Sequence, residues 1–407
     1  MNKIYYRLTL KNTTPLAIGS GQEGETDKSI ARDSYGNPVI PATALAGAIS
    51  HQISIKDQEI LGQNKKDNED YAQSQIIFYD AKIQGEEKSS IRDGIALDAY
   101  KTTIEGAKYD FEILEPGHTF RTYLEYDENG DVESTAIHIL EILANGAFYL
   151  GSKTTRGYGK IDLKKVEYIK FDLTNDKTLM EWLDFDVFNT QSNWSPVEVV
   201  ENKDSSTISY RMMLKQEGFI SIRKYITSPS KFFIMPDQEQ LTYKEGKMEI
   251  PVIPGTSWAG AFRHHLNRLA QTKEEQIKIK TLFGYTDKTK SQKSQISFNE
   301  TTLKSAKSKI VMRNAIDRFT NATIDGNLFT EKVFEDGQGT LVITIPKNTD
   351  QEMTRLLEYA ILDLHYGFLS IGGATAIGRG LFKIESLEIN GKACSIEALE
   401  KGKPNGN

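Results

Sequence analysis

One stretch of this 407-residue chain carries basic and hydroxyl side chains between closely spaced glycines: residues 151–159 read GSKTTRGYG. Glycine allows a positive φ and a close approach of another backbone, and Lys, Thr and Arg donate hydrogen bonds that suit phosphate oxygens. The stretch lacks the G-x-x-x-x-G-K-[ST] pattern of a nucleotide-binding P-loop. It therefore predicts a phosphate contact of another kind, and the alternative is a helix-to-strand turn whose glycines serve geometry alone.

A second stretch predicts a phosphate contact from its backbone. A turn-rich lead with Asp27 and Asp33 precedes a short apolar strand, and Pro41 ends that strand. Thr43 is then placed to cap a helix that begins with small residues. Because a helix start presents free N–H groups and the positive end of the helix dipole, it favours an anion.

Both stretches recur later in the chain. The strand-and-proline phrase returns as IPVIPGTSWAG at residues 250–260, so Pro254 follows Pro41 by 213 positions. Gly378 follows Gly157 by 221 positions. Landmarks in the same order at nearly one spacing indicate a duplicated domain, because such a period is too long for a solenoid repeat.

Periodicity predicts the elements that position these stretches. Tyr6, Leu8 and Leu10 alternate with polar residues as in a strand, and residues 134–145 place apolar side chains on one helical face. The order strand, helix, strand, strand, helix, strand is typical of the ferredoxin-like α+β fold, the class that includes RNA-recognition modules. The predicted division is a first domain at 1–172, an acidic linker at 173–206, a second domain at 207–396 and a polar tail at 397–407.

Composition excludes several classes of protein. The only cysteine, Cys394, excludes an intrachain disulfide and a multi-cysteine zinc site. No run approaches the roughly 18 apolar residues of a membrane helix, so we expect a cytoplasmic protein without membrane contact. The net charge of −6 argues against general nucleic-acid affinity, but lysines and arginines gather at 153–170 and 263–309. The charge is segregated, and its overall sign decides little.

Together these segments resemble the RAMP superfamily, and specifically the backbone subunits of type III CRISPR effector complexes. The likeness is carried by residues 16–21, 38–47 and 151–159 in the first copy, and by residues 251–260, 282–284 and 371–380 in the second. Two copies in one chain look like the fused backbone subunit of type III-D systems. The resemblance implies two tandem ferredoxin-like RAMP domains, each with a protruding β-hairpin called the thumb.

The resemblance also implies partners: a guide RNA (crRNA), a target RNA and other CRISPR effector subunits. Each helix start and glycine loop would grip the guide backbone. The residues so assigned are Thr43, Lys153, Thr154, Thr155, Arg156, Tyr158, Thr256, Ser257, Arg263, His264, Thr375 and Arg379. The second loop departs from the first, because a shift of 221 places Ile377 opposite Arg156 and Arg379 opposite Tyr158.

Family members carry a target-cutting aspartate in the early loop, and Asp27, fourteen positions before Pro41, matches that place. In the second copy Asp237 lies seventeen positions before Pro254, and Glu239 competes at fifteen. The implied chemistry is attack of a 2′-hydroxyl on its own phosphate, helped by a divalent cation, Mg²⁺, that Asp27 and Asp237 would hold. A single carboxylate needs RNA oxygens to complete the coordination. The plain alternative is a solvated loop carboxylate.

The thumbs are predicted at residues 91–106 and 313–326. Ile104 or Phe319 would wedge between bases, and Arg92 and Arg313, 221 positions apart, would meet phosphates at the thumb bases. Ordinary hairpin residues are the alternative.

Three other functions stay open from sequence. The chain would be a guide-binding scaffold that leaves cutting to its neighbours, or a guide-processing endoribonuclease with His51 as its acid–base. The last alternative is a duplicated ligand-binding protein without RNA.

Overall fold

The computed structural model describes residues 2–21, 26–62, 73–97, 103–189, 193–199, 206–224, 236–245, 248–286 and 290–402. The chain divides into two compact units. The first unit comprises Met1–Gly94, Tyr109–Thr154 and Tyr158–Asp204. The second unit comprises Ile95–Lys108, Thr155–Gly157 and Ser205–Asn407.

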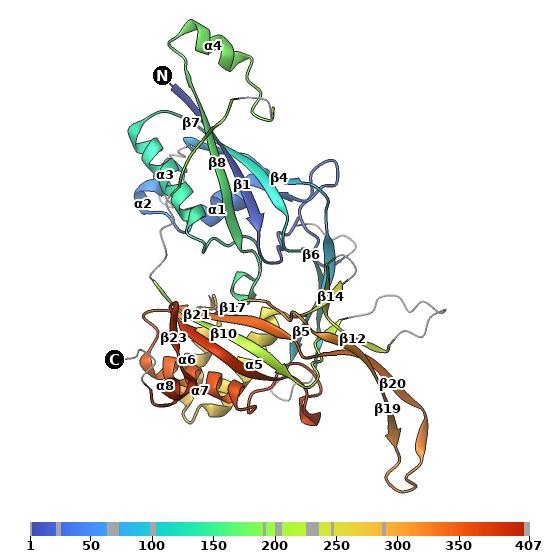
Figure 1. The fold of residues 1–407 in the computed structure, drawn as a ribbon. Coiled ribbons are helices and arrows are strands. Elements are labelled where there is room, and N and C mark those ends of the chain that lie inside the picture. Colours follow the sequence, from blue (N-terminus) through green and yellow to red (C-terminus); the bar gives the residue numbers. More distant parts are fainter. Residues whose placement is uncertain are drawn as a thin grey trace. The chain divides into compact units, whose positions relative to one another are not determined.

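The first unit is built on an antiparallel sheet with the strand order β4-β7-β1-β8 (Figure 1). These strands are β1 (Asn2–Asn12), β4 (Ala81–Gln84), β7 (Thr119–Asp127) and β8 (Ile161–Asp172). Short strands extend this sheet: β2 (Val39–Ile40), β3 (Ile76–Phe78) and β9 (Ser195–Pro196). In chain order the four main strands occupy the ferredoxin positions, as the sequence predicted.

Three helices of this unit lie on one side of the sheet (Figure 1): α1 (Ala42–Ser50), α2 (Ile55–Ile60) and α3 (Gly130–Ala144). Leu8 of β1 and Ile139 of α3 belong to the buried core between sheet and helices. Helix α3 begins four residues before the predicted start, because the Asn129 side chain accepts the N–H of Asp131 and caps the helix there.

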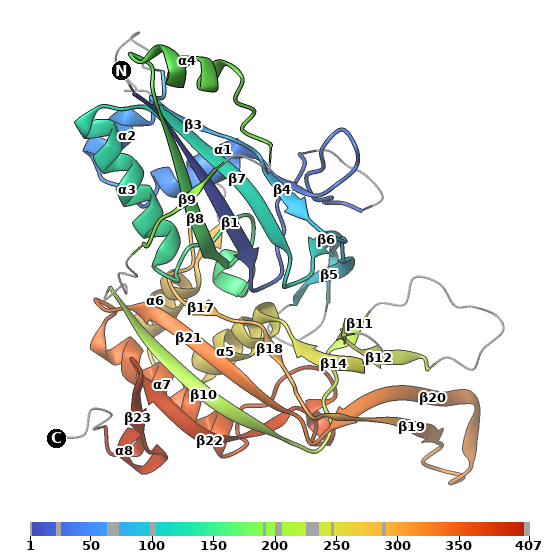
Figure 2. The same ribbon diagram turned by 45° about the horizontal axis from the view of Figure 1, so that its top comes forward.

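The second unit repeats the arrangement with the strand order β17-β21-β10-β22-β23 (Figure 2). Its sheet strands are β10 (Thr207–Glu217), β17 (Ser297–Phe298), β21 (Gln338–Pro346), β22 (Leu381–Ile389) and β23 (Lys392–Cys394). Its helices are α5 (Gly255–Leu269), α6 (Lys273–Phe283), α7 (Gln351–His365) and α8 (Ile396–Glu400). Met212, Phe262 and Ile361 are fully buried in its core. The predicted duplication of the fold is confirmed.

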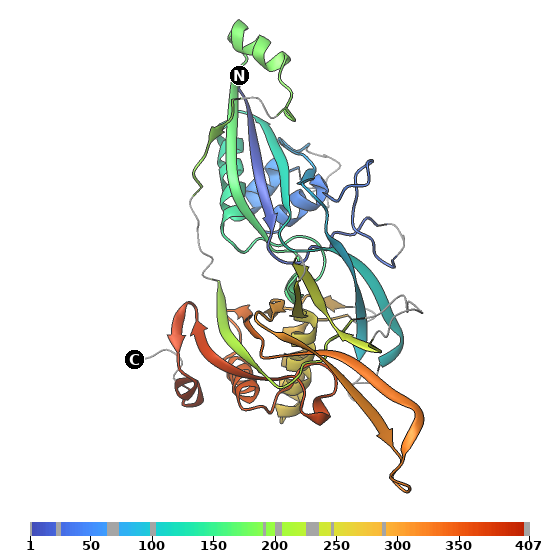
Figure 3. The ribbon, with the colours of Figure 1, turned by 45° about the vertical axis from the view of Figure 1, so that its right-hand side comes forward.

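Each copy also carries a long hairpin that extends beyond its sheet (Figure 3). The first hairpin is β5 (Ser89–Leu97) with β6 (Thr103–Leu114), and the second is β19 (Lys307–Ile316) with β20 (Thr323–Glu335). These correspond to the predicted thumbs, and the first turn, residues 98–102, lies outside the described residues.

Short elements complete the second unit. They are β11 (Arg223–Lys224), β12 (Gln238–Gln240), β13 (Thr242–Glu245), β14 (Met248–Ile253), β15 (Tyr285–Thr286), β16 (Ser291–Gln292) and β18 (Thr301–Thr302). Strand β12 pairs in parallel with β20 and so joins the early loop to the second hairpin.

The predicted connecting segments contain regular elements. The described part of the predicted linker at 173–206 includes α4 (Asp176–Leu183) and β9. Trp182 donates a hydrogen bond to the hydroxyl of Tyr5 at 3.0 Å, which ties this segment to the first sheet. The supposed polar tail begins with α8, whose Leu399 is fully buried.

No helix in the described parts of the chain is long and apolar enough to cross a membrane.

Candidate functional site

The carboxylate of Asp27 is exposed and lies against strand β6 of the first hairpin. Its Oδ2 accepts the backbone N–H of Asp110 at 2.9 Å. In return, Oδ1 of Asp110 accepts the backbone N–H of Asp27 at 2.8 Å. The two hydrogen bonds fix the early loop to the base of the hairpin.

Asp237 is held in the same way in the second copy. Its exposed carboxylate accepts, at Oδ2, the backbone N–H of Thr330 on β20 at 2.7 Å. The Thr330 hydroxyl donates to the same oxygen at 3.0 Å. These two hydrogen bonds lower the pKa of Asp237 below its usual value, and the bond from the backbone N–H has the larger effect.

The two aspartates are therefore structural equivalents. Thr330 follows Asp110 by 220 positions and Asp237 follows Asp27 by 210, so the early loops differ in length. The carboxylates nevertheless reach the same amide of the second hairpin strand. Glu239 instead lies within β12 and pairs with Lys332. Of the two competing acids in the second copy, Asp237 is the one that matches Asp27 in position.

Behind Asp27 lies an aromatic cage around a lysine. Nζ of Lys153 is 3.1 Å from the ring centre of Phe111, 4.8 Å from that of Tyr109 and 5.9 Å from that of Tyr158. Burial, with the nearby positive charges of Lys28 and Arg92, lowers the pKa of Lys153 to about 7.

Tyr158 is fully buried in this cage. Its hydroxyl accepts a hydrogen bond from Nη1 of Arg92 at 3.1 Å. Arg92 is itself buried, with its guanidinium 5.6 Å from the Tyr158 ring centre. Both residues were predicted to meet RNA, and in this structure they join the base of the hairpin to the glycine loop.

Charged side chains occupy the corresponding place behind Asp237. Oε1 of the buried Glu331 accepts a hydrogen bond from Nη2 of Arg313 at 2.6 Å. Nη2 of Arg379, also buried, lies 2.5 Å from the other carboxylate oxygen of Glu331. Arg313 comes from the hairpin and Arg379 from the glycine loop, so this triad makes the same connection as the aromatic cage.

Sequence reasoning missed Phe111 and Glu331, the central members of the two clusters. Both follow directly after the residue that binds the aspartate. The 220-residue spacing that relates the two hairpins pairs them, and that spacing was the signal that could have found them.

The family model described as RAMPs, the RAMP superfamily, matches residues 9–162 and 236–383, which together make up more than half of the chain. The chain belongs to the RAMP superfamily. The predicted membership is confirmed, and the two matched regions are the two copies described above, which are hereafter the first and second RAMP domains.

One similar solved structure is described as the cryo-EM structure of the type III-B Cmr-beta bound to cognate target RNA. The matching chain is 20% identical, with a TM-score of 0.34. The match covers 41% of this chain and 61% of that chain. The comparison with curated proteins found no match.

The helix starts of the RAMP domains differ from expectation. The N-cap residue of α1 is Pro41, and no side chain makes a capping hydrogen bond there. The prediction that Thr43 caps this helix is therefore wrong. Thr43 instead lies in the first turn of the helix and is exposed. A carboxylate already lies at this helix start, because Oδ1 of Asp80 accepts the N–H of Ala42 at 2.7 Å. The first RAMP domain thus supplies its own anion where a phosphate was expected.

Helix α5 of the second RAMP domain also begins after a proline, Pro254, without a side-chain cap. In its first turns Thr256 and Arg263 are exposed, and Ser257 and His264 are half-buried. Their role in RNA binding stays a prediction.

The glycine loops have the backbone geometry that their sequences predict. Gly159 and Gly380 have φ of +79° and +74°, and a Cβ at either position would lie 1.9 Å from a backbone oxygen, that of Leu150 or Ile371. Between the glycines, Thr154–Arg156 and Thr375–Ile377 form single 3-10 turns. Within the second unit, Nη2 of Arg156 donates to the carbonyl of Phe283 at 3.4 Å.

The thumb residues predicted as wedges are exposed. Phe319, in the second turn, is 87% exposed, and Ile104 at the start of β6 is 47% exposed. These apolar side chains face solvent on hairpins whose bases hold the aspartates.

A metal ion would find few protein ligands. In the described ranges, no three His, Cys, Asp or Glu side chains lie close enough together to hold an ion. Carboxylate oxygens are the ligand type that Mg²⁺ prefers, and the Asp27 site offers two carboxylates where the Asp237 site offers one. The residues fit an ion whose remaining ligands come from RNA and water.

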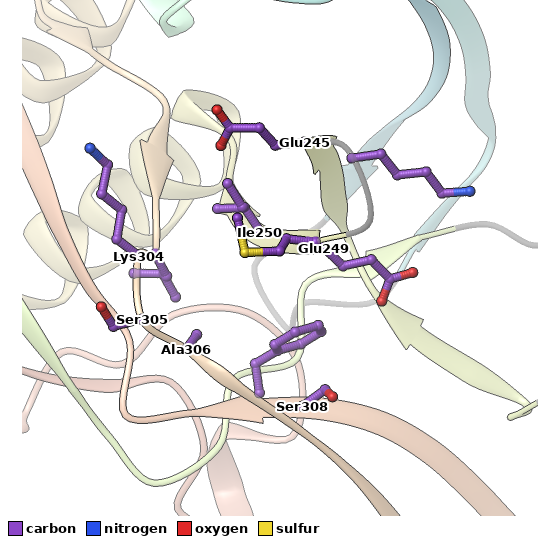
Figure 4. Close-up of a pocket in the computed structure, with 11 residues that line it drawn as sticks. Glu245, Glu249, Ile250, Lys304, Ser305, Ala306 and Ser308 are labelled. Atoms are coloured by element: carbon purple, nitrogen blue, oxygen red, sulfur yellow. The ribbon is translucent and has the colours of Figure 1, made fainter.

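The second RAMP domain also contains a cavity of about 830 Å³ (Figure 4). Glu245, Glu249 and Ile250 of the β13–β14 hairpin line one side, and the segment from Lys304 to Ser308 lines the other. Neither the aspartate nor the glycine-loop residues line this cavity, so it is separate from the candidate site.

Proposed function

We propose that this chain is an RNA-binding backbone subunit of a type III CRISPR effector complex, and that it cuts target RNA at two sites, Asp27 and Asp237. The observation that carries the proposal is the equivalent placement of the two carboxylates. Loops of different length bring both of them to the backbone amide at the base of a thumb. The same placement in both copies supports a shared role for the two carboxylates beyond an ordinary loop.

The residues of each RAMP domain act in three places. The glycine loop and helix start bind the guide backbone, with the exposed Thr43, Thr256 and Arg263 of the helices and the half-buried hydroxyl and basic groups of the loops as donors to phosphate. The wedge residues Ile104 and Phe319 unstack the guide–target pairing at the thumb. The aspartate, at the base of the thumb, would act on a target phosphate that passes the hairpin there. Positioning of this kind allows a 2′-hydroxyl to reach its in-line geometry.

In the reaction, the 2′-oxygen bonds to the adjacent phosphorus and loses its proton, while the bond from phosphorus to the 5′-oxygen breaks and the 5′-oxygen takes up a proton. The products carry a 2′,3′-cyclic phosphate and a 5′-hydroxyl, so no further reactant is consumed. A bound Mg²⁺ would supply positive charge at the phosphate oxygens. The protein contributes an ionised carboxylate, and the hydrogen bonds that lower the pKa of Asp237 keep it ionised at neutral pH.

The test uses the complex assembled with its guide and an end-labelled complementary RNA. We expect Asp27→Asn and Asp237→Asn each to abolish one distinct product and to leave target binding unchanged. Asp33→Asn is the matched control, because Asp33 is a half-exposed aspartate of the same early loop that accepts the N–H groups of Tyr35 and Asn37 in an ordinary turn. Loss of a carboxylate at an electrostatic site costs on the order of a hundredfold or more in rate.

If both variants keep the native product ladder, the proposal of cutting is wrong and the chain is a guide-binding scaffold. Absence of a copurified RNA of defined length would contradict the RNA-binding part as well.

A further inference from the structure

Three side chains behind each aspartate connect the hairpin to the glycine loop. In the first RAMP domain they are Arg92, Phe111 and Tyr158, and in the second they are Arg313, Glu331 and Arg379. The members of each pair lie 221, 220 and 221 positions apart, so the two sets occupy equivalent places. We call each set a latch. The first latch, called the aromatic latch, consists of two aromatic rings and an arginine. The second, called the ionic latch, consists of a glutamate between two arginines.

The ionic latch lies directly beside the second candidate site. Glu331 follows Thr330, whose amide and hydroxyl bind the carboxylate of Asp237. On the other side, Asp237 is followed by Gln238, which pairs in parallel with Glu331 across β12 and β20. A displacement of Glu331 therefore moves both the donor and the acceptor of the bond that orients the aspartate.

Arg379 gives the latch a second connection. One of its nitrogens lies on Glu331, while Nη1 is buried and finds no hydrogen-bond acceptor among the described residues. An unsatisfied guanidinium donor is costly in a folded protein, and an RNA phosphate would satisfy it. Contact with a guide phosphate would require the glycine loop to expose this nitrogen, and the guanidinium would then join the phosphate to Glu331.

We propose that Glu331 is a positioning residue of the second site, which couples RNA binding at the glycine loop to the orientation of Asp237 through Arg379. The inference rests on the cutting role proposed for Asp237. When a phosphate holds Arg379, the carboxylate of Glu331 is held as well, and β20 keeps the Thr330 amide aimed at the aspartate.

Stability alone does not account for the ionic latch. Buried ion pairs are weak stabilisers compared with apolar residues of similar volume, because both charges lose their hydration. The first RAMP domain fills the same place with Phe111 and Tyr158, both buried. A role of Glu331 in positioning Asp237 explains why charged side chains lie between the glycine loop and the aspartate in the second domain.

The first experiment compares Glu331→Gln with native chain in the assembled, guide-loaded complex at saturating target RNA. We expect the Asp237-dependent cut to slow by about tenfold or more, since small misplacements of a reacting group are costly. The Asp27-dependent cut in the same molecules is the internal control and stays within about twofold. Target affinity stays unchanged, so the loss lies in turnover and not in binding.

The second experiment transplants the aromatic latch into the second domain. The triple variant Glu331→Phe, Arg379→Tyr, Ile377→Arg copies Phe111, Tyr158 and the loop arginine of the first domain. We expect it to recover the second cut to within about threefold of native, because it restores a satisfied connection without the ions.

Hydrogen exchange at the Thr330 amide gives a readout that does not depend on cutting. Guide binding is expected to slow this exchange in native complex, and to do so much less in Glu331→Gln. Native-like exchange together with a native second cut in Glu331→Gln overturns the inference. If instead Asp237→Asn still cuts at the second position, the proposed function fails, and the exchange measurement alone decides whether Glu331 couples the loop to β20.

Discussion

Next to Asp27, aromatic side chains connect the base of the hairpin to the glycine loop. Next to Asp237, charged side chains make the same connection. The first cluster packs Phe111 and Tyr158 against a buried arginine and a caged lysine. The second places one carboxylate, Glu331, between two guanidinium groups. Both clusters connect the same three elements: the two hairpin strands and the glycine loop.

Both copies therefore keep the connection between hairpin and glycine loop, although aromatic side chains make it in one copy and charged side chains in the other. Phe111 and Glu331 both fill one place on the second hairpin strand, and in each copy the preceding residue binds the aspartate. Aromatic and charged side chains differ in the free-energy cost of burial, in how the stability of the domain depends on pH, and in the charge that they place near the aspartate. The two RAMP domains should therefore respond differently to the same kinds of perturbation.

The largest contrast is expected in stability. Glu331→Gln removes the only carboxylate of the ionic latch and leaves the buried Arg379 uncompensated, at a cost of about 3 kcal/mol in unfolding free energy. Tyr158→Phe removes one hydrogen bond from Arg92 and keeps the ring, at a cost of about 1 kcal/mol. Urea denaturation of the two variants measures both losses. Equal losses would show that the two latches do not differ in kind.

The aromatic cage should give the first RAMP domain a dependence on pH. Folding lowers the pKa of Lys153 from 10.5 to about 7, so between these values the unfolded chain binds more protons than the folded chain. Stability then rises with pH above 7, by up to about 1.4 kcal/mol per pH unit. Lys153→Met should lose this rise, as seen by urea unfolding at pH 7 and pH 9.

The exposed Lys88→Met is the control for that experiment and should keep the native slope, because Lys88 is not among the groups that lower the pKa of Lys153. The second domain has Ala374 at the place of Lys153, so its unfolding should not show this contribution. A slope that persists in Lys153→Met would contradict the assignment.

The smallest effect is expected for the metal requirement of the two cuts. Asp110 adds a carboxylate beside Asp27, whereas Thr330 adds a hydroxyl beside Asp237. Because affinity for Mg²⁺ rises with ligand charge, the first cut should reach half its maximal rate at roughly fivefold lower Mg²⁺. Asp110→Thr and Thr330→Asp keep both backbone amides and should exchange the two requirements. Identical magnesium curves in native chain and in the swapped variants would show that the neighbouring side chain is not a ligand.

The sequence by itself determined the duplication, the fold of each copy and the loop that carries each aspartate. Local patterns decided these features: alternation in β1, the proline that ends each early strand, and glycines that need a positive φ. Such patterns depend on neighbours along the chain, so periodicity and spacing are enough to find them. The choice of Asp237 over Glu239 needed the structure, because the two differ by only two positions in a loop of altered length.

Only the tertiary structure decided what surrounds these residues. Asp110 binds Asp27 from 83 positions away, and Asp80 lies at a helix start 38 positions before it. Glu331 joins arginines from two separate elements, and Trp182 fastens a supposed linker to the first strand. These contacts depend on sheet register and on which polar groups are buried together. Both arise when distant strands pair, and no local sequence pattern fixes them.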